Sequence, residues 1–445
     1  MVKTRPVSLP RDLSFLADGC DEKIKKHVLN LIDKARAEGV WDEPVDMVVD
    51  TNDLNFVAYW VGKTQKPILN PRSGFGLREH FEKFKATDFQ WNIQGEVMEN
   101  ITMSASGDLM QGKHIETSGD HLYKYVSPLI FGRDLSYANL ESTLSKDAPR
   151  PMGVEGQGDT PQINITKNQY HTLVKHETHK YDILQISNNH IMDCGFEGAD
   201  ITMDQLRKDH IKYVGAYRNA SEVNQTVFTD TKGIKIGWVG HTFSLNGKAL
   251  PKGKEWMIDV TPFLEVEDPD LTRIEAQIKR AKEDGCDLVA VALHWGIEFE
   301  LYPHPKQIEF AHRIAEMGAD MIIGHHPHIA QPYEIYTPMR DSNVRVPILY
   351  SLGNLIPVFS GESTVLSYVA NIQISKIKSG DHIRVFVTGM QVTPVAFMEE
   401  ESEEGTYGVL IPIKDLKNKV WDQETQAYID TICSQASLIM GDSWR

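Results

Sequence analysis

Cysteine is scarce in this sequence, and long apolar runs and an excess of positive charge are both missing. Its four cysteines, Cys20, Cys194, Cys286 and Cys433, are far apart and form no C-x-x-C pair. This excludes a thiolate zinc site or a disulfide framework that could be recognised from spacing. No apolar run reaches the roughly 18 residues that a membrane span needs, and the first residues lack the apolar centre of a signal peptide. We therefore expect a cytoplasmic, soluble protein with reduced thiols and no membrane anchor.

The charge balance is acidic, with 62 acidic and 46 basic residues and a formal net charge of -16. A surface of this sign repels phosphate backbones, so the sequence argues against a nucleic-acid partner held by general charge attraction. A bound metal ion would reverse the sign inside a cleft, and a small anionic ligand is therefore still compatible with this composition. Hydrophobic residues make up 41% of the chain, enough to build a large core.

Three regions can be separated along the chain. Residues 1–98 form an N-terminal accessory segment, in which 21–38 has the apolar periodicity of a helix and 45–61 is expected to supply one or two strands. Residues 99–415 alternate short β-rich runs with helical stretches, which predicts an α/β fold in which helices cover sheets. Residues 416–445 form a C-terminal tail with a helix at about 423–439.

Within the central region, the alternation can be assigned element by element. Strands are expected at 101–105, 183–187, 234–239, 288–293, 321–323 and 347–350, and helices at 199–208, 270–283 and 305–317. Near the end, 367–377 and 382–390 alternate apolar and polar residues around the turn sequence Lys-Ser-Gly-Asp. This pattern is typical of a hairpin, so we expect an antiparallel element at one edge of the sheet system.

Residues that can bind metal ions follow four of these predicted strands at the same relative place. Asp108, Asn189 with His190, His294, and the histidines at 325, 326 and 328 each come directly after a β-rich run. The carboxyl ends of strands in α/β sheets form the crevice in which ligands bind. We therefore expect these side chains to converge on one site.

The residue types indicate which metals such a site would hold. Oxygen donors suit hard divalent ions and imidazole suits zinc, manganese and iron, so a mixed Asp/Glu/Asn/His set fits first-row metals. Two ions about 4 Å apart can stabilise both the attacking and the leaving oxygen and lower the pKa of a bridging water. A bridging carboxylate would hold two ions that close together, and Glu141 is the candidate for it.

Each motif alone also has an ordinary structural explanation. The pair Gly107-Asp108 is common in proteins, Asn189 could simply form a turn, and His294 beside Trp295 could be a hydrogen-bonded core histidine. The sequence Gly-His-His-Pro-His at 324–328 is different, because three histidines in four residues after a buried strand are difficult to explain as packing.

Six motifs occur in a fixed order along the chain. They are Gly107-Asp108-Leu109-Met110, Asn139-Leu140-Glu141, Ser187-Asn188-Asn189-His190 with Asp193 and Gly195, His294-Trp295-Gly296 with Glu298, Gly324-His325-His326-Pro327-His328 and Tyr350-Ser351-Leu352-Gly353-Asn354. This series resembles the CapA (poly-γ-glutamate synthesis) family, a branch of the calcineurin-like metallophosphoesterases, over roughly residues 99–395. The resemblance implies a four-layer α/β/β/α sandwich with a dinuclear site between the sheets.

The resemblance also implies a role for each residue of the site. Asp108 would bind the first of two divalent ions (Mn, Zn or Fe), and Glu141 would stand where phosphoesterases carry a bridging Asp. Asn189 and His294 would bind the second ion. His326 and His328 would bind one ion each, with His325 as a competing assignment. His190 would face the substrate as a proton donor or anion stabiliser, oriented by Asp193.

The sequence departs from the phosphoesterase pattern at two positions. Met110 stands where phosphoesterases carry a histidine, and Glu141 replaces the bridging Asp. In addition, members of the family that serve capsule assembly are typically tethered to the membrane, and the sequence shows no anchor. These departures favour a soluble relative with its own substrate.

Several other segments have less specific patterns. Glu298 and His304 belong to the stretch after His294 and are expected near the pocket, although His304 could equally begin the following helix. His241 ends a predicted strand and could reach the substrate. The cluster His171, His176 and His179 is expected on the surface. The Pro/Gly-rich segment 150–159 is expected to be a loop that could cover the site.

Two classes of function are compatible with these residues. The first is a metal-dependent hydrolase acting on an amide such as a γ-glutamyl linkage, or alternatively on a phosphoester, since two cations and a His donor favour both reactions. The second is a non-catalytic binder or assembly factor that holds an anionic polymer through its metals. The presence of His190 and Asp193 favours the enzyme.

Overall fold

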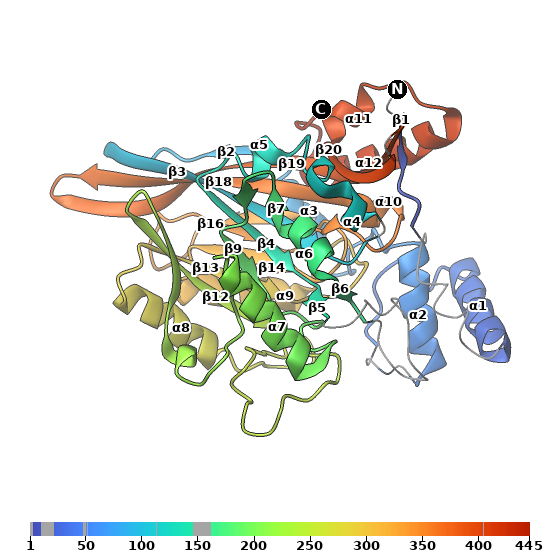
Figure 1. Ribbon diagram of the computed structural model, residues 1–445, viewed down its shortest axis with the longest axis horizontal. Helices are drawn as coiled ribbons and strands as arrows, with labels where there is room; N and C mark the ends of the chain where they lie inside the picture. Colours follow the sequence, from blue (N-terminus) through green and yellow to red (C-terminus); the bar gives the residue numbers. More distant parts are fainter. Residues whose placement is uncertain are drawn as a thin grey trace.

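The computed structural model describes residues 3–9, 22–47, 50, 52–112, 114–145, 162–403 and 405–445. Strands in these ranges form two large sheets in the middle of the molecule, and helices lie mostly around them (Figure 1). The expected loop at 150–159 lies outside the described residues. No helix in the described ranges is both long and apolar enough to cross a lipid bilayer.

The larger sheet contains parallel strands at its centre and antiparallel strands on one side. Its order is β1 (Lys3–Pro6), β19 (His382–Ser402), β18 (Leu366–Ser379), β3 (Glu96–Leu109), β4 (Leu135–Leu140), β9 (Ile183–Gln185) and β10 (Lys212–Val214), with β17 (Asn354–Ile356) paired to β3, and β2 (Asp88–Gln90) and β20 (Gly405–Pro412) paired to β19. The β18–β19 pair confirms the expected hairpin, because Ser379 pairs with His382 across the predicted turn.

The smaller sheet has a parallel centre as well. Its order is β11 (Val227–Thr231), β12 (Ile234–Thr242), β13 (Leu288–His294), β14 (Met321–His325), β16 (Val346–Leu349) and β15 (Tyr333–Tyr336). Two short ladders join β5 (Thr143–Leu144) to β6 (Asn164–Ile165) and β7 (Lys175–His176) to β8 (His179–Lys180). Each strand predicted in the central region overlaps an observed one.

The two sheets pack against each other, and the longer helices cover their outer sides. Between the sheets, the ring of Tyr137 in β4 stacks on Trp238 in β12 with a centroid distance of 5.1 Å. Helix α7 (Gly195–Lys208) contacts β5 and β10, α8 (Thr272–Glu283) contacts β12 and β13, and α9 (Pro305–Glu316) contacts β14. The expected α/β/β/α arrangement is therefore confirmed.

Beyond the helices of the N-terminal residues 22–65, the remaining helices are short or lie at the periphery. They are α3 (Leu77–Glu82), α4 (Ile115–Ser118), η2 (Gly119–His121), α5 (Ser127–Ile130), α6 (Lys167–Val174), η3 (Glu222–Asn224), α10 (Glu362–Val365), α11 (Ile413–Lys417) and α12 (Gln423–Met440). The expected C-terminal helix is α12, and it contacts β1, so the two ends of the chain lie close together (Figure 1).

The expectation of strands at 45–61 is wrong, because the second half of this stretch is helical. Helix α2 (Leu54–Gln65) begins after Asp53, whose side chain caps it by accepting a hydrogen bond from the Asn55 backbone N–H at 2.9 Å. It packs on α1 (Glu22–Ala37) through a small separate core of Val28, Ile32, Ala58 and Val61. The aromatic and β-branched residues of this stretch serve a helix face instead of a strand.

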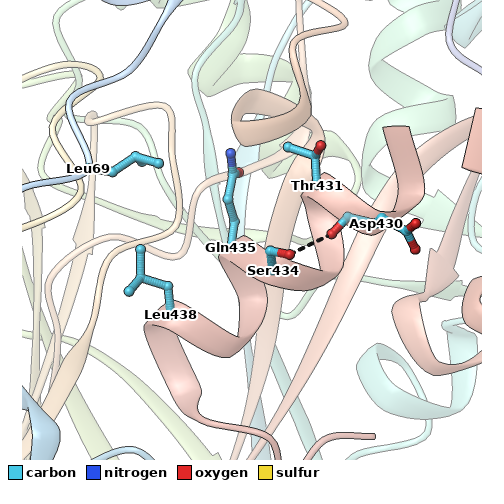
Figure 2. Close-up of a pocket in the computed structure, with 6 residues that line it drawn as sticks. All are labelled: Leu69, Asp430, Thr431, Ser434, Gln435 and Leu438. Carbon is cyan, nitrogen blue, oxygen red and sulfur yellow. Dashed lines mark hydrogen bonds between the residues drawn. The ribbon is translucent and has the colours of Figure 1, made fainter. Parts of the chain in front are cut away.

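A surface hollow of about 310 Å³ lies against α12 (Figure 2). It is lined by Leu69, Asp430, Thr431, Ser434, Gln435 and Leu438. The Ser434 hydroxyl donates to the Asp430 carbonyl within the helix at 2.8 Å, so this polar group is already satisfied. None of the predicted site residues lines this hollow.

Candidate metal centre

The strand register brings the predicted site residues to one edge of both sheets. In the larger sheet β3 and β4 run parallel with Asp108 beside Asn139, and in the smaller sheet β13 and β14 run parallel with His294 beside His325. Because parallel strands end at the same edge, the residues that follow them meet between the two sheets. Asp108, Glu141, His294 and His325 are all 0% exposed.

Glu141 lies at the centre of this group. Neither of its carboxylate oxygens has a hydrogen-bond partner in the described part of the chain, although the residue is fully buried. Its Oε1 lies 3.4 Å from His294 Nε2, 3.9 Å from His190 Nε2 and 4.0 Å from His328 Nε2. Burial, followed by the charge of Asp108, raises the pKa of Glu141 well above its usual range. A buried carboxylate without donors needs a cation or a proton.

Asp108 is held by neighbours that favour its charged form. Asn139 donates a hydrogen bond from Nδ2 to Asp108 Oδ1 at 2.9 Å, and His325 Nδ1 lies 2.7 Å from the same oxygen. Burial would raise the pKa of Asp108, but the adjacent His325 outweighs burial and lowers it. The two neighbouring carboxylates therefore differ, with Asp108 ionised and Glu141 inclined to hold a proton.

The three histidines after β14 have different surroundings. His325 has a neighbour at both ring nitrogens, because its Nε2 lies 2.9 Å from the Tyr137 hydroxyl and its Nδ1 faces Asp108. His326 Nδ1 has no partner among the described residues, and the residue is 4% exposed. His328 Nδ1 lies 3.0 Å from Asn354 Oδ1, which leaves its Nε2 facing Glu141.

The backbone that carries His326 and His328 is unusual. Their φ angles are +100° and +60°, in a region that residues with side chains rarely adopt. Such conformations cost energy and persist where the surrounding structure imposes them, often at functional sites. Here the turn directs the imidazoles of His326 and His328 toward Glu141, whereas the imidazole of His325 points to Tyr137.

His294 and His326 are both neutral imidazoles in this setting. Burial lowers the pKa of His294 to about 3, and burial together with His294 and His328 lowers the pKa of His326 well below its usual range. His294 Nε2 lies 2.8 Å from Asn189 Oδ1, and Asn246 Oδ1 accepts from Asn189 Nδ2 at 3.3 Å. Neutral imidazole is the form that binds metal ions.

His190 lies beside the group and is tied to Asp193. His190 Nδ1 is 2.7 Å from Asp193 Oδ2, and the Ile163 backbone N–H donates to the same oxygen at 2.6 Å. Burial lowers the pKa of His190, but the charge of Asp193 and its hydrogen bond, helped by Glu141, outweigh burial and raise it. The second nitrogen, Nε2, faces Glu141.

The side chains fit divalent cations in three overlapping groups. These groups are Glu141–His294–His326, Asp108–Glu141–His328 and Glu298–His326–His328, and within each group the ligand atoms lie within 4.8 Å of one another. Glu141 is shared by two groups, and its unpartnered oxygens fit a bridging position. Buried carboxylate and imidazole donors of this kind suit manganese, zinc or iron.

The site contains two features that the sequence alone did not identify. Asn139 donates a hydrogen bond to Asp108, and Glu298 lies in one of the three groups that could hold a metal ion. Asn139 lies in the Asn-Leu-Glu motif, two residues before Glu141. Its position at a strand end could have identified it as a site residue. For Glu298, the signal was its position four residues after His294.

Other histidines lie away from the centre. His241 is fully buried, with Nδ1 2.9 Å from Thr261 Oγ1 and Nε2 2.8 Å from Gln277 Oε1, so the expectation that it reaches the substrate is wrong. His304 caps α9 by accepting from the Lys306 backbone N–H at 3.1 Å. The expected surface cluster is wrong in part, because His176 is buried.

Comparison with known proteins assigns this chain to a family. The family model described as bacterial capsule synthesis protein PGA_cap matches residues 102–357, more than half of the chain. All of the candidate ligands discussed above lie within the matched residues. Among solved structures, sulfate thiohydrolase SoxB of Thermus thermophilus in complex with glycerol aligns with 57% of this chain and 36% of its own at 12% identity, with a TM-score of 0.28.

Two curated relatives match this chain with similar sequence identity and coverage. The capsule biosynthesis protein CapA of Bacillus anthracis is 29% identical over 270 residues, covering 58% of this chain and 60% of the relative. The PGA biosynthesis protein CapA of Bacillus subtilis is 28% identical over 267 residues, covering 58% and 63%. The chain thus matches about three fifths of the length of these relatives. The chain belongs to the bacterial capsule synthesis PGA_cap family.

Proposed function

We propose that this protein is a metal-dependent hydrolase that cleaves an amide bond in a small γ-glutamyl substrate. The observation that carries the proposal is Glu141, a fully buried carboxylate whose two oxygens lack hydrogen-bond partners in the described structure and face three imidazoles. A packing or hydrogen-bonding role would leave this group unsatisfied at considerable cost. A dinuclear centre would satisfy it.

The proposed ligands divide between the two ions. Asp108 and His328 would serve one ion, Asn189, His294 and His326 would serve the other, and Glu141 would bridge them. Glu298, which lies with His326 and His328, would be a further ligand. Two bound divalent ions would supply a water molecule of lowered pKa and positive charge that stabilises the transition state. We assign His325 a positioning role, since its two ring nitrogens already face Asp108 and Tyr137.

His190 and Asp193 are the proposed acid–base pair. Asp193 holds Nδ1 of the imidazole, so the proton available for transfer is the one on Nε2, the nitrogen that faces the ligand cluster. The raised pKa of His190 favours the protonated imidazole. His190 would donate it to the amine that leaves when the amide bond breaks.

The preference for an amide rests on the family and on two residues. The Bacillus subtilis relative is named as a PGA biosynthesis protein, and the motifs of this sequence resemble the CapA family of poly-γ-glutamate synthesis. In this chain Met110 and Glu141 both depart from the ligand pattern of phosphoesterases. The net charge of -16 repels long polyanions outside the cleft, which favours a small conjugate over a polymer.

A substrate panel tests this proposal directly. Protein loaded with Mn²⁺ or Zn²⁺ should be offered γ-glutamyl amides and short γ-glutamyl oligomers beside phosphomonoesters and phosphodiesters. We expect cleavage at an amide in a substrate that carries at least one carboxylate. Efficient phosphodiester cleavage with every γ-glutamyl compound inert would make the protein a phosphoesterase. Metal-dependent affinity for γ-glutamyl compounds without any product would make it a binder.

A further inference from the structure

Helix α2 of the N-terminal segment is locked onto the loop that follows β13. The buried carboxylate of Glu300 accepts from the Tyr59 hydroxyl at 3.2 Å and pairs with Lys63 Nζ at 3.1 Å and Arg72 Nη2 at 3.4 Å. Next to it, the Ile68 backbone N–H donates to the Phe299 carbonyl at 2.9 Å. Breaking a buried ion pair by removing one partner is strongly destabilising, so this contact holds α2 firmly against the loop after β13.

The same helix reaches the candidate metal centre through one side chain. The indole N–H of Trp60 donates to Glu298 Oε2 at 2.5 Å. The other oxygen of this carboxylate, Oε1, lies 3.6 Å from His328 Nε2, and Glu298 forms a ligand group with His326 and His328. Trp60 lies outside residues 102–357, the part of the chain that the family model matches.

We propose that Trp60 is a positioning residue for the metal centre, acting through Glu298. This inference rests on the metal centre of the proposed function and assigns a role to the N-terminal segment. Indole is a donor only, so its contact fixes one carboxylate oxygen and leaves the other directed at the ligand cluster. Outer partners that orient a ligand in this way commonly change metal affinity by about 10- to 100-fold.

The contacts around Trp60 hold its side chain in one position next to Glu298. On α2, Trp60 lies between Tyr59 and Lys63, and both of these residues contact the Glu300 carboxylate. These contacts fix the position of the indole. Phe299, between the two glutamates, has a φ of +60°, a conformation that a bulky residue adopts only when the surroundings impose it. The anchored helix therefore holds a strained turn that presents Glu298.

Metal titration of a matched pair of variants tests the role. Trp60→Phe removes the N–H and keeps an aromatic ring, and Trp91→Phe makes the same change at a partly buried tryptophan that stacks on Phe89. Metal-free full-length proteins should be titrated with Mn²⁺ and, separately, Zn²⁺ by calorimetry. We expect Trp60→Phe to weaken one binding step by about 10- to 100-fold and Trp91→Phe to leave both steps unchanged.

A double-mutant cycle with Glu298→Ala separates positioning from a general effect on folding. If Trp60 acts through Glu298, Trp60→Phe should weaken binding in the wild-type background and have no further effect in Glu298→Ala. Unchanged affinity in Trp60→Phe, or an equal loss in both backgrounds, would overturn the role. The titration does not depend on the substrate, so wild-type protein that binds two ions and cleaves no amide refutes the amide function alone. Wild-type protein that binds no ion refutes both.

Discussion

Asp193 Oδ2 lies 2.7 Å from Nδ1 of His190, and this contact fixes the ring so that Nε2 faces the cluster around Glu141. Lys248 Nζ lies 3.4 Å from the other oxygen of Asp193. The imidazole is therefore oriented by a carboxylate that is itself held by a backbone N–H and a nearby cation. In the proposed function, this arrangement would position His190 as a proton donor and not as a metal ligand.

Removing this imidazole should separate chemistry from metal binding. We expect His190→Ala to retain both ions and to lose turnover by on the order of 10²-fold or more, because a positioned acid contributes about that much. Asp193→Asn should cause a smaller loss by letting the ring drift. Elemental analysis and steady-state kinetics on the same preparations give the comparison. Loss of metal with unchanged activity per bound ion would contradict the assignment.

Metal stoichiometry gives a second prediction. Purified or reconstituted protein should bind about two ions per chain, and His294→Ala or His326→Ala should lower that number because each leaves a coordination position open. His382→Ala, an exposed histidine at the start of β19, is the matched control and should bind as the wild type does. Elemental analysis that finds no metal after reconstitution would end the dinuclear hypothesis.

His325 and His326 should respond differently to the same substitution. His326→Asn should weaken metal binding strongly, since it removes an imidazole that lies with Glu141 and His294 in a group able to hold a metal ion. His325→Asn should chiefly lower the melting temperature of the metal-free protein, since it breaks the contacts with Tyr137 and Asp108. The assignment fails if His325→Asn leaves the melting temperature unchanged and His326→Asn leaves the affinity unchanged.

Acid stability should depend on Glu334 in β15, away from the candidate centre. Its carboxylate lies 2.6 Å from His312 Nε2, His80 Nε2 and the Tyr350 hydroxyl. Burial would raise the pKa of Glu334, but these hydrogen bonds and the charge of His312 outweigh it and lower the pKa to about 2. A lowered folded pKa contributes stability above the unfolded value of about 4.5 that is lost as pH falls toward 2.

Comparison of wild type with Glu334→Gln measures this contribution. At pH 6 to 7 the wild type should be more stable by about 3 kcal/mol, as a shift of this size implies, and the difference should shrink steadily below pH 4.5. Denaturant unfolding of the metal-free proteins at several pH values gives the curve. A difference that stays constant from pH 7 to pH 2.5 would show that the ionisation of Glu334 contributes nothing to stability.

Much of the architecture and of the candidate site could be predicted from local patterns. Asp108, Asn189, His294 and the histidines of 324–328 each follow a β-rich run, and parallel strands end at a common edge, so their convergence follows from the order of elements. Helix α2 was missed because its Val, Phe, Tyr and Trp residues also suit a strand. The capping Asp53 was the signal for a helix.

Other features depend on contacts that no local pattern contains. His325 and His326 are chemically identical in the sequence, and only the positive φ of His326 directs one imidazole to Glu141 and the other to Tyr137. Burial of His241 and His176 follows from packing by distant elements. Trp60 and Glu298 are separated by 238 positions, so their hydrogen bond appears only once the chain is folded.

The candidate ligands come from both sheets, and this arrangement has a consequence for how the protein would unfold. Asp108 and Glu141 lie at the ends of strands of the larger sheet, whereas His294, His326 and His328 lie at the ends of strands of the smaller one. Bound ions would act as a crosslink that closes a loop of more than 150 residues. Such a crosslink lowers the conformational entropy of the unfolded chain. Amide hydrogens in β3 and β14 should then exchange with solvent in one concerted opening when ions are bound, and in two separate openings after chelation.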